Sequence, residues 1–243
     1  MNEDFDEFDK YALSYDMNEK MIEYKYNHSY RVVHQAEEIC RSLNLDTVER
    51  DLASQIALLH DIARFRQWTE YKTFEDSKSF DHGAEGVKIL FDEGLIKKFK
   101  INKDDYDIVK KAIYNHNKFS INFNELNERE VLHSKIVRDA DKIDIIYSFS
   151  TNRLLEIEED NQEISENVGE DFLNHRQVLK KDIKSKNDRI LMLIGLIYDL
   201  YYDYSKERVL HEGYINKLYS HLKNKKMFKP YIIEAENYLK GKK

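Results

Sequence analysis

The chain has 243 residues and a formal net charge of −7, with acidic and basic residues interspersed. This charge pattern argues against an extended surface for nucleic acid and leaves room only for a small basic pocket. The single cysteine, Cys40, excludes an internal disulfide framework and favours a reducing, cytoplasmic location. With 7 glycines and 1 proline, the chain has little turn punctuation, which favours long helices over a β architecture.

Neither a membrane helix nor a targeting signal is expected. Residues 2–9 are rich in Asp, Glu and Phe rather than basic and apolar. The most apolar run, residues 190–198, is too short to span a bilayer, so it predicts a core helix. Because no repeat, linker or low-complexity tract divides the sequence, we expect one all-α domain over residues 1–243.

Apolar residues recur at helical spacing through the first half of the chain. The pattern and its capping residues predict helices, in chain order, over 4–15, over about 17–43, from a cap at Asp46 or Thr47 to about 64, from a cap at Asp81 to Gly94, and over about 104–117. A further helix carries the apolar stripe Ile136, Ala140, Ile143 and Tyr147. The periodicity is lost over 65–80, so we expect a loop there, and its Trp68, Tyr71 and Phe74 indicate either a lid or pocket wall, or simple surface packing.

The remainder, from about residue 151, is expected to be helical throughout. The predicted helices are 168–184, 187–205, 210–222 and 227–241, and the acid-rich stretch 156–170 is the expected loop or junction. His175, His211 and His221 show no ligand spacing and are expected at the surface.

Four candidate site residues follow from the first half of this pattern. His28 lies on the apolar stripe of its helix, whereas His34 does not. His60 and Asp61 are adjacent in sequence, and adjacent helix positions point about 100° apart, so both reach one ion only where a helix ends or packs tightly. His82 falls in the first turn of the helix that Asp81 caps.

Two more candidates follow later in the chain. His116 closes an apolar stripe and therefore needs a hydrogen bond or an ion. Asp141 borders an apolar seam, whereas Asp139 and Asp144 are assigned to a solvated helix face. A set of imidazole nitrogens and carboxylate oxygens suits zinc, iron, manganese or cobalt better than calcium. The alternative interpretation is core histidines with ordinary hydrogen-bond partners.

Three segments with candidate ligands follow one another along the chain: His28-Ser29-Tyr30-Arg31-Val32, then Leu58-Leu59-His60-Asp61-Ile62, then Ala140-Asp141-Lys142. In these segments the sequence resembles the HD-domain metal-dependent phosphohydrolases, whose pattern is H…HD…D on a helical bundle. His82 and His116 are similar to the extra histidines of the binuclear branch. The resemblance covers about residues 20–150 and implies an HD-domain helical bundle, with a helical C-terminal extension over about 151–243.

The resemblance implies a phosphohydrolase that uses metal-activated water. The candidate metal ligands are His28, His60, Asp61, His82, His116 and Asp141. Four of them can hold one divalent ion with open positions, and six suffice for two ions roughly 4 Å apart, with Asp61 as the bridge. The metal would be iron, manganese, cobalt, nickel or zinc. We expect His60 and Asp61 to be the catalytic pair, and Arg31, Arg64 and Lys142 either to contact substrate phosphate or to be ordinary surface charges.

The expected partner is a small nucleotide or another phosphorylated compound, and the oligomeric state stays open. The Gly-Tyr-Pro element of the cyclic-di-GMP phosphodiesterase branch is absent after His116. The extra acidic motif of guanosine tetraphosphate hydrolases is absent as well. A nucleotide monoester, a diester and a dinucleoside polyphosphate all stay open as substrates. Two other functions are possible: a non-catalytic, metal-containing, nucleotide-binding regulatory module, and a helical interaction protein without metal.

Overall fold

The structure is a computed structural model that describes residues 2–151 and 158–241. Every regular element in these two ranges is a helix, so the predicted all-α class is confirmed. The chain divides into two compact units, Met1–Asp141 and Lys142–Lys243. The expectation of one domain over 1–243 stays a prediction. None of the helices in the described ranges combines the length and the apolar composition that a membrane span requires.

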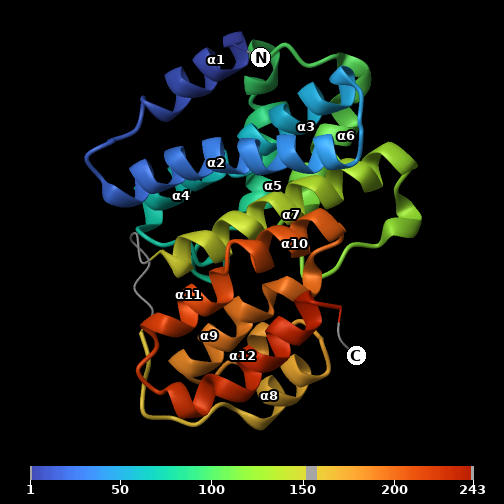
Figure 1. The fold of residues 1–243 in the computed structure, drawn as a ribbon. Helices are drawn as coiled ribbons and strands as arrows, with labels where there is room; N and C mark the ends of the chain where they lie inside the picture. The colour runs from blue at the N-terminus through green and yellow to red at the C-terminus, as the bar shows by residue number, and fades with distance from the viewer. Residues whose placement is uncertain (1, 152–157, 242–243) are drawn as a thin grey trace. The chain divides into compact units, whose positions relative to one another are not determined.

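The first unit holds the helices and helix ends that carry all six candidate residues (Figure 1). Its elements are α1 (Asn2–Ala12), α2 (Lys20–Ser42), α3 (Thr47–Leu59), α4 (Ala63–Tyr71), η1 (Asp76–Lys78), α5 (His82–Val87), the π-helical turn η2 (Lys88–Asp92), η3 (Leu95–Lys98), η4 (Lys103–Asp105), α6 (Tyr106–Asn115), η5 (Phe123–Glu125) and α7 (Glu128–Ser150). Helix α2 packs along α3 and α4, and α5 packs beside α6. The boundary between the units falls inside α7.

The predicted caps at Asp46 and Asp81 and the stop at Gly94 are confirmed, whereas the helix expected to run to about 64 ends at Leu59. Asp46 caps α3 by accepting a hydrogen bond from the Glu49 amide at 3.0 Å. Asp81 caps α5 by accepting one from the Ala84 amide at 3.0 Å. Gly94, with φ of 80°, follows the π-helical turn and ends that stretch of helix. Left-handed backbone of this kind favours glycine.

The prediction that the whole of 65–80 is a loop is wrong. Residues 65–71 belong to α4, and only the stretch between α4 and α5 is a loop with the short turn η1. Phe65 is fully buried and packs edge-on against Phe8 and Tyr11 of α1, with ring centroids 6.0 and 6.1 Å apart. Tertiary packing on α1 therefore stabilises a helix that the local apolar pattern does not show.

The second unit, beyond α7, is a set of short helices. They are α8 (Glu166–Leu173), η6 (Lys180–Asp182), α9 (Lys186–Ile194), η7 (Gly195–Asp199), α10 (Asp203–His211), α11 (Tyr214–His221) and α12 (Lys225–Leu239). The predicted helices over 168–184 and 187–205 are too long. His175 has φ of 56° just after α8, and the second stretch is interrupted by η7 before α10 begins. Of the expected junction 156–170, residues 156 and 157 lie outside the described ranges, 158–165 are not helical, and the rest enters α8.

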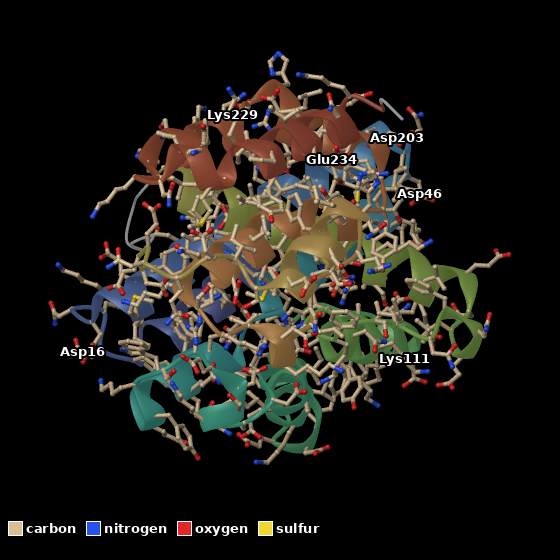
Figure 2. The ribbon with its side chains drawn as sticks, turned by 90° about the horizontal axis from the view of Figure 1, so that it is seen from below. Asp16, Asp46, Lys111, Asp203, Lys229 and Glu234 are labelled. Atoms are coloured by element: carbon tan, nitrogen blue, oxygen red, sulfur yellow. The ribbon has the colours of Figure 1, made fainter. Side chains whose placement is uncertain are left out.

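Charged side chains are spread over the outside of each unit (Figure 2). The labelled examples are Asp16, Asp46 and Lys111 in the first unit, and Asp203, Lys229 and Glu234 in the second. The assignment of Asp139 and Asp144 to this solvated class is wrong, because only 0% and 1% of their surfaces are exposed. From sequence alone, a charged helix residue is assigned to the surface, because charged residues are mostly exposed. Both residues have interaction partners inside the protein.

A buried histidine in α7 gives the first unit a pH dependence. His133 Nε2 lies 2.7 Å from Glu49 Oε2 of α3, and burial lowers the pKa of His133. Between that lowered pKa and the ordinary value of about 6.5, the unfolded chain binds more protons, so stability falls as the pH drops below 6.5. When the pH is lowered from 7.5 to 5.5, the free energy of unfolding of His133→Gln should fall by about 1 kcal/mol less than that of the wild type.

Urea unfolding at the two pH values measures this difference. Titrating groups that do not contact His133 contribute equally in both proteins and cancel in the comparison. Equal losses in the two proteins would mean that His133 titrates alike in the folded and unfolded chains.

Candidate metal centre

Helix ends and helix faces of the first unit bring all six candidate residues together. His28 lies in the middle of α2, and Asp141 lies on α7. His60 and Asp61 occupy the turn between α3 and α4, which is the helix end that two adjacent residues need in order to share an ion. His82 begins α5, and His116 follows the last residue of α6.

One cluster of donor atoms surrounds Asp61 Oδ2. His28 Nε2 lies 3.4 Å from this oxygen and 3.2 Å from Asp141 Oδ1. His60 Nε2 lies 3.6 Å from each of the same two oxygens and 3.3 Å from His28 Nε2. We call these four residues the first cluster. Its four donor atoms can face one cation at once.

A second cluster surrounds the other oxygen of the same carboxylate. His82 Nε2 and His116 Nε2 each lie 3.5 Å from Asp61 Oδ1 and 3.0 Å from each other. Asp61 therefore presents Oδ2 to the first cluster and Oδ1 to the second. A carboxylate in this position could serve an ion at each cluster.

The protonation of the histidines fits a cation at both clusters. His60 Nδ1 donates to the Ala57 carbonyl at 2.7 Å, and His116 Nδ1 donates to the Ile113 carbonyl at 2.6 Å. A carbonyl only accepts, so in the neutral rings Nε2 carries a lone pair rather than a proton. These lone pairs converge on carboxylate oxygens, and Asp61 Oδ1 is buried without a hydrogen-bond partner within the described part of the chain. Lys25 donates to Asp61 Oδ2 and Arg64 to His82 Nε2, and a buried set of acceptors that attracts two cationic side chains also favours a metal cation.

Burial keeps the histidines of the second cluster neutral. It lowers the pKa of His82 to about 3, with the Arg64 charge acting in the same direction, and it lowers the pKa of His116. Burial alone would raise the pKa of Asp61, but the positive charges around it, led by Lys25, hold that pKa well below its usual range. The second cluster thus offers neutral imidazoles and an ionised carboxylate at neutral pH, which are the forms that bind metal.

Asp76 orients one of these histidines and was not predicted from the sequence. Its Oδ2 accepts the Nδ1 proton of His82 at 2.7 Å, which aims Nε2 at the cluster. The side chains of Gln67 and Asn117 donate to the same carboxylate at 3.1 and 3.2 Å. A carboxylate behind a ligating histidine fixes its tautomer and raises its basicity. Asp76 sits in the aperiodic loop before α5, so no sequence spacing pointed to it.

A glycine allows the two helices of the second cluster to approach each other. A Cβ on Gly83 would lie 2.7 Å from Asn117 Oδ1 and 3.0 Å from the Tyr114 carbonyl oxygen. The second contact is with backbone, which cannot move aside as easily as a side chain. The residue after His82 is therefore glycine because α5 and α6 are too close there for any side chain.

The three residues predicted to contact phosphate are in different surroundings. Arg64 Nε lies 3.4 Å from Asp61 Oδ1, and its Nη2 lies 3.1 Å from His82 Nε2. Arg31 lies over the Tyr24 ring, with the guanidinium carbon 5.8 Å from the ring centroid. Lys142 Nζ lies 2.8 Å from Asp199 Oδ2, and both side chains are buried. The ion pair with Asp199 accounts for the burial of Lys142.

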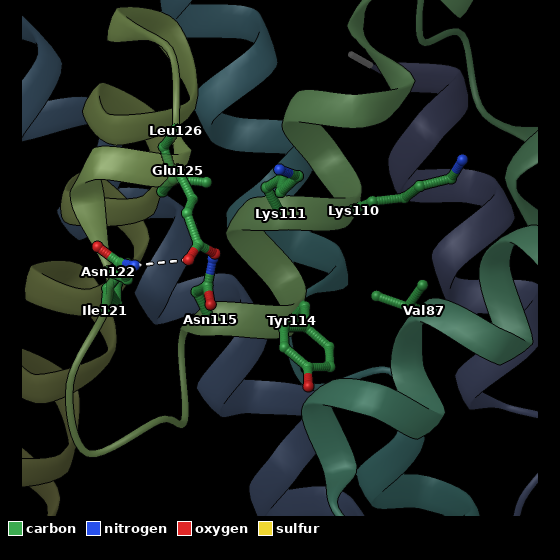
Figure 3. Close-up of a pocket in the computed structure, with 9 residues that line it drawn as sticks. All are labelled: Val87, Lys110, Lys111, Tyr114, Asn115, Ile121, Asn122, Glu125 and Leu126. Carbon is green, nitrogen blue, oxygen red and sulfur yellow. Dashed lines mark hydrogen bonds between the residues drawn. The ribbon is translucent and has the colours of Figure 1, made fainter.

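A cavity of about 410 Å³ in the first unit lies apart from these clusters (Figure 3). Its lining residues are Val87, Lys110, Lys111, Tyr114, Asn115, Ile121, Asn122, Glu125 and Leu126. Inside it Asn122 donates to Glu125 Oε1 at 2.6 Å. The lining contains neither histidine nor aspartate, so we place the candidate site at the two clusters and not in this cavity.

A family model described as the HD domain matches residues 26–146. The chain belongs to the HD-domain superfamily of metal-dependent phosphohydrolases. The match contains all six candidate residues, and the all-α architecture agrees with it. No curated protein and no solved structure shows significant similarity to the chain. HD domains bind divalent metals, and the groups His28–His60–Asp141 and His60–Asp61–His116 can hold one.

Asp76 is expected to act on the second cluster alone. Asp76→Asn keeps an acceptor for His82 but removes the charge behind it, so the affinity for an ion at the second cluster should fall about 10- to 100-fold. The first cluster does not contact Asp76 in the described structure and should keep its affinity. Metal titration of the chelator-treated protein measures the two affinities. Asp107→Asn, an exposed aspartate of α6, is the control, and equal weakening of both ions would contradict the assignment.

Proposed function

We propose that the protein is a metal-dependent phosphohydrolase that cleaves a phosphate ester or anhydride of a nucleotide-like substrate. The observation that carries the proposal is the division of Asp61 between two donor clusters, with Oδ2 facing His28 and His60 and Oδ1 facing His82 and His116. In a purely structural core, histidine nitrogen lone pairs that face carboxylate oxygens would add no stability. The arrangement supports two ions and therefore hydrolysis at a phosphoryl group.

Each part of the site has a role in this reaction. His28, His60, Asp61 and Asp141 would hold one ion, and His82, His116 and Asp61 the other. When bound, divalent transition-metal ions supply Lewis acidity: they lower the pKa of water and neutralise phosphoryl oxygens. Lys25 contacts Asp61 Oδ2 and Arg64 lies close to Asp61 Oδ1, and their positive charges keep that carboxylate ionised. Burial of the clusters limits competing water and strengthens every charge interaction there.

The test is elemental analysis of anaerobically purified protein, followed by phosphate release from a broad panel of nucleotides. We expect one to two ions of iron, manganese, cobalt, nickel or zinc per chain and turnover of at least one substrate. A metal-replete protein that binds nucleotides tightly without turnover would instead support the regulatory module. A protein without metal would support the helical interaction protein.

A further inference from the structure

A buried lysine that the sequence pattern did not single out lies at the first cluster. Lys25 is on α2, one turn before His28, and its side chain is 9% exposed. Its Nζ donates to Asp61 Oδ2 at 2.5 Å. This is the carboxylate oxygen that faces His28 and His60. A group that binds at the first cluster is therefore within reach of the Lys25 ammonium.

The ammonium of Lys25 has donors to spare. A lysine carries three N–H donors, and Asp61 takes one of them. The rings of Tyr24 and Phe74 lie 5.8 and 5.4 Å from Nζ and supply cation–π contacts rather than hydrogen bonds. Among the described residues, Asp61 is the one hydrogen-bond acceptor for this ammonium. Because buried N–H donors are usually hydrogen-bonded, the remaining donors of this ammonium favour an acceptor atom supplied by a ligand.

Arg64 is placed differently, although it was the cation expected to contact phosphate. Its Nη1 donates to Gln67 Oε1 at 2.6 Å, to the Phe74 carbonyl at 2.8 Å and to Asp76 at 3.2 Å. Its Nη2 faces His82 Nε2. The guanidinium thus holds the loop before α5 and acts as a positioning group for Asp76 and His82.

We propose that Lys25 binds a non-bridging oxygen of the substrate's phosphoryl group and makes the site selective for a terminal, doubly charged phosphate. This rests on the proposed phosphohydrolase function and adds to it a substrate class. The three carboxylates Asp61, Asp76 and Asp141 outnumber the two cations Lys25 and Arg64 by one negative charge. Two divalent ions would turn this into three positive charges.

A terminal phosphate ester carries up to two negative charges, whereas an internal diester carries one. In a site shielded from water, the dianion gains more from the surplus positive charge than the monoanion does. Lys25 supplies one of these positive charges together with a hydrogen bond. Its removal should therefore weaken the binding of a dianion more than that of a diester.

The test compares Lys25→Met with wild type, both loaded with manganese. Calorimetry measures the binding of inorganic phosphate, and kinetics measure kcat/KM for p-nitrophenyl phosphate and bis-p-nitrophenyl phosphate. We expect phosphate binding to weaken about 10- to 100-fold, the monoester-to-diester ratio to fall about 10-fold or more, and the metal content to stay unchanged. Lys25→Arg should recover most of the phosphate affinity. Lys20→Met, an exposed lysine of the same helix, should behave as wild type.

The outcomes separate this inference from the proposed function. If wild type hydrolyses a phosphate ester and folded Lys25→Met binds phosphate equally well, the role of Lys25 is overturned and the phosphohydrolase stands. Loss of metal from folded Lys25→Met also overturns it, because the lysine would then serve Asp61 alone. If metal-loaded wild type neither binds phosphate nor hydrolyses any ester, the proposed function itself fails. Lys25→Gln, which keeps a donor to Asp61, replaces Lys25→Met if that variant does not fold.

Discussion

Asp61→Ala is expected to abolish both metal sites at once. Its two oxygens face different clusters, so its loss removes a ligand from each. Asp141→Ala removes a ligand from the first cluster only, and His116→Ala from the second only. The expected metal content is therefore none for the first variant and about one ion per chain for each of the other two. Elemental analysis of the three proteins, purified side by side, measures this pattern.

Activity should follow the metal in these variants. Loss of both ions removes several kcal/mol of transition-state stabilisation, so phosphate release by Asp61→Ala should fall by at least about 10³-fold. Asp51→Ala, an exposed aspartate of the same helix α3, is the control. Because Asp61→Ala leaves Lys25 buried without its partner, Asp61→Asn should be measured as well, with circular dichroism to show that both variants fold. Two ions retained in a folded Asp61→Ala would exclude the shared carboxylate.

Arg138→Met is expected to cause the largest loss of stability. Arg138 is 1% exposed, and its Nη1 donates to the carbonyl oxygens of Asn115, His116 and Lys118 at 2.8, 3.1 and 2.7 Å. Methionine fills similar space but removes this donor from all three carbonyls, of which the Asn115 carbonyl keeps the Lys118 amide at 3.2 Å. Because each buried unsatisfied group costs about 1–3 kcal/mol, the free energy of unfolding should fall by roughly 3–5 kcal/mol.

Urea unfolding of the metal-free protein measures this effect. The control is Arg41→Met, an arginine of α2 that is 52% exposed and pairs with neighbouring glutamates on the same helix. It should change stability by less than about 1 kcal/mol. Since the backbone around His116 is what Arg138 holds, Arg138→Met should also weaken the ion at the second cluster. Similar stability for the two variants would show that the carbonyls find other partners.

Features that depend on neighbouring residues in the sequence were predictable. The caps at Asp46 and Asp81 and the stop at Gly94 follow from local backbone chemistry. The placement of His28 on a buried stripe and of His34 on an exposed face follows from the helical period. His60 and Asp61 fall at a helix end, as two adjacent donors to one ion require.

Features that depend on distant partners were not predictable. Lys25 contacts Asp61 from 36 residues away, and Arg138 contacts carbonyl groups 20 to 23 residues away. Asp139 and Asp144 are buried although their helix pattern placed them in solvent, and each has an interaction partner within the protein. One signal was available for Lys25: it lies three residues before His28, and residues three apart share a helix face.

The lowered pKa values of four site residues decide how many protons a bound cation would displace from them. Asp61, Asp141, His82 and His116 all have pKa values below their ordinary ones, so at pH 7 these four are already free of the protons that a cation would displace. Ion uptake through them therefore releases no protons to the buffer.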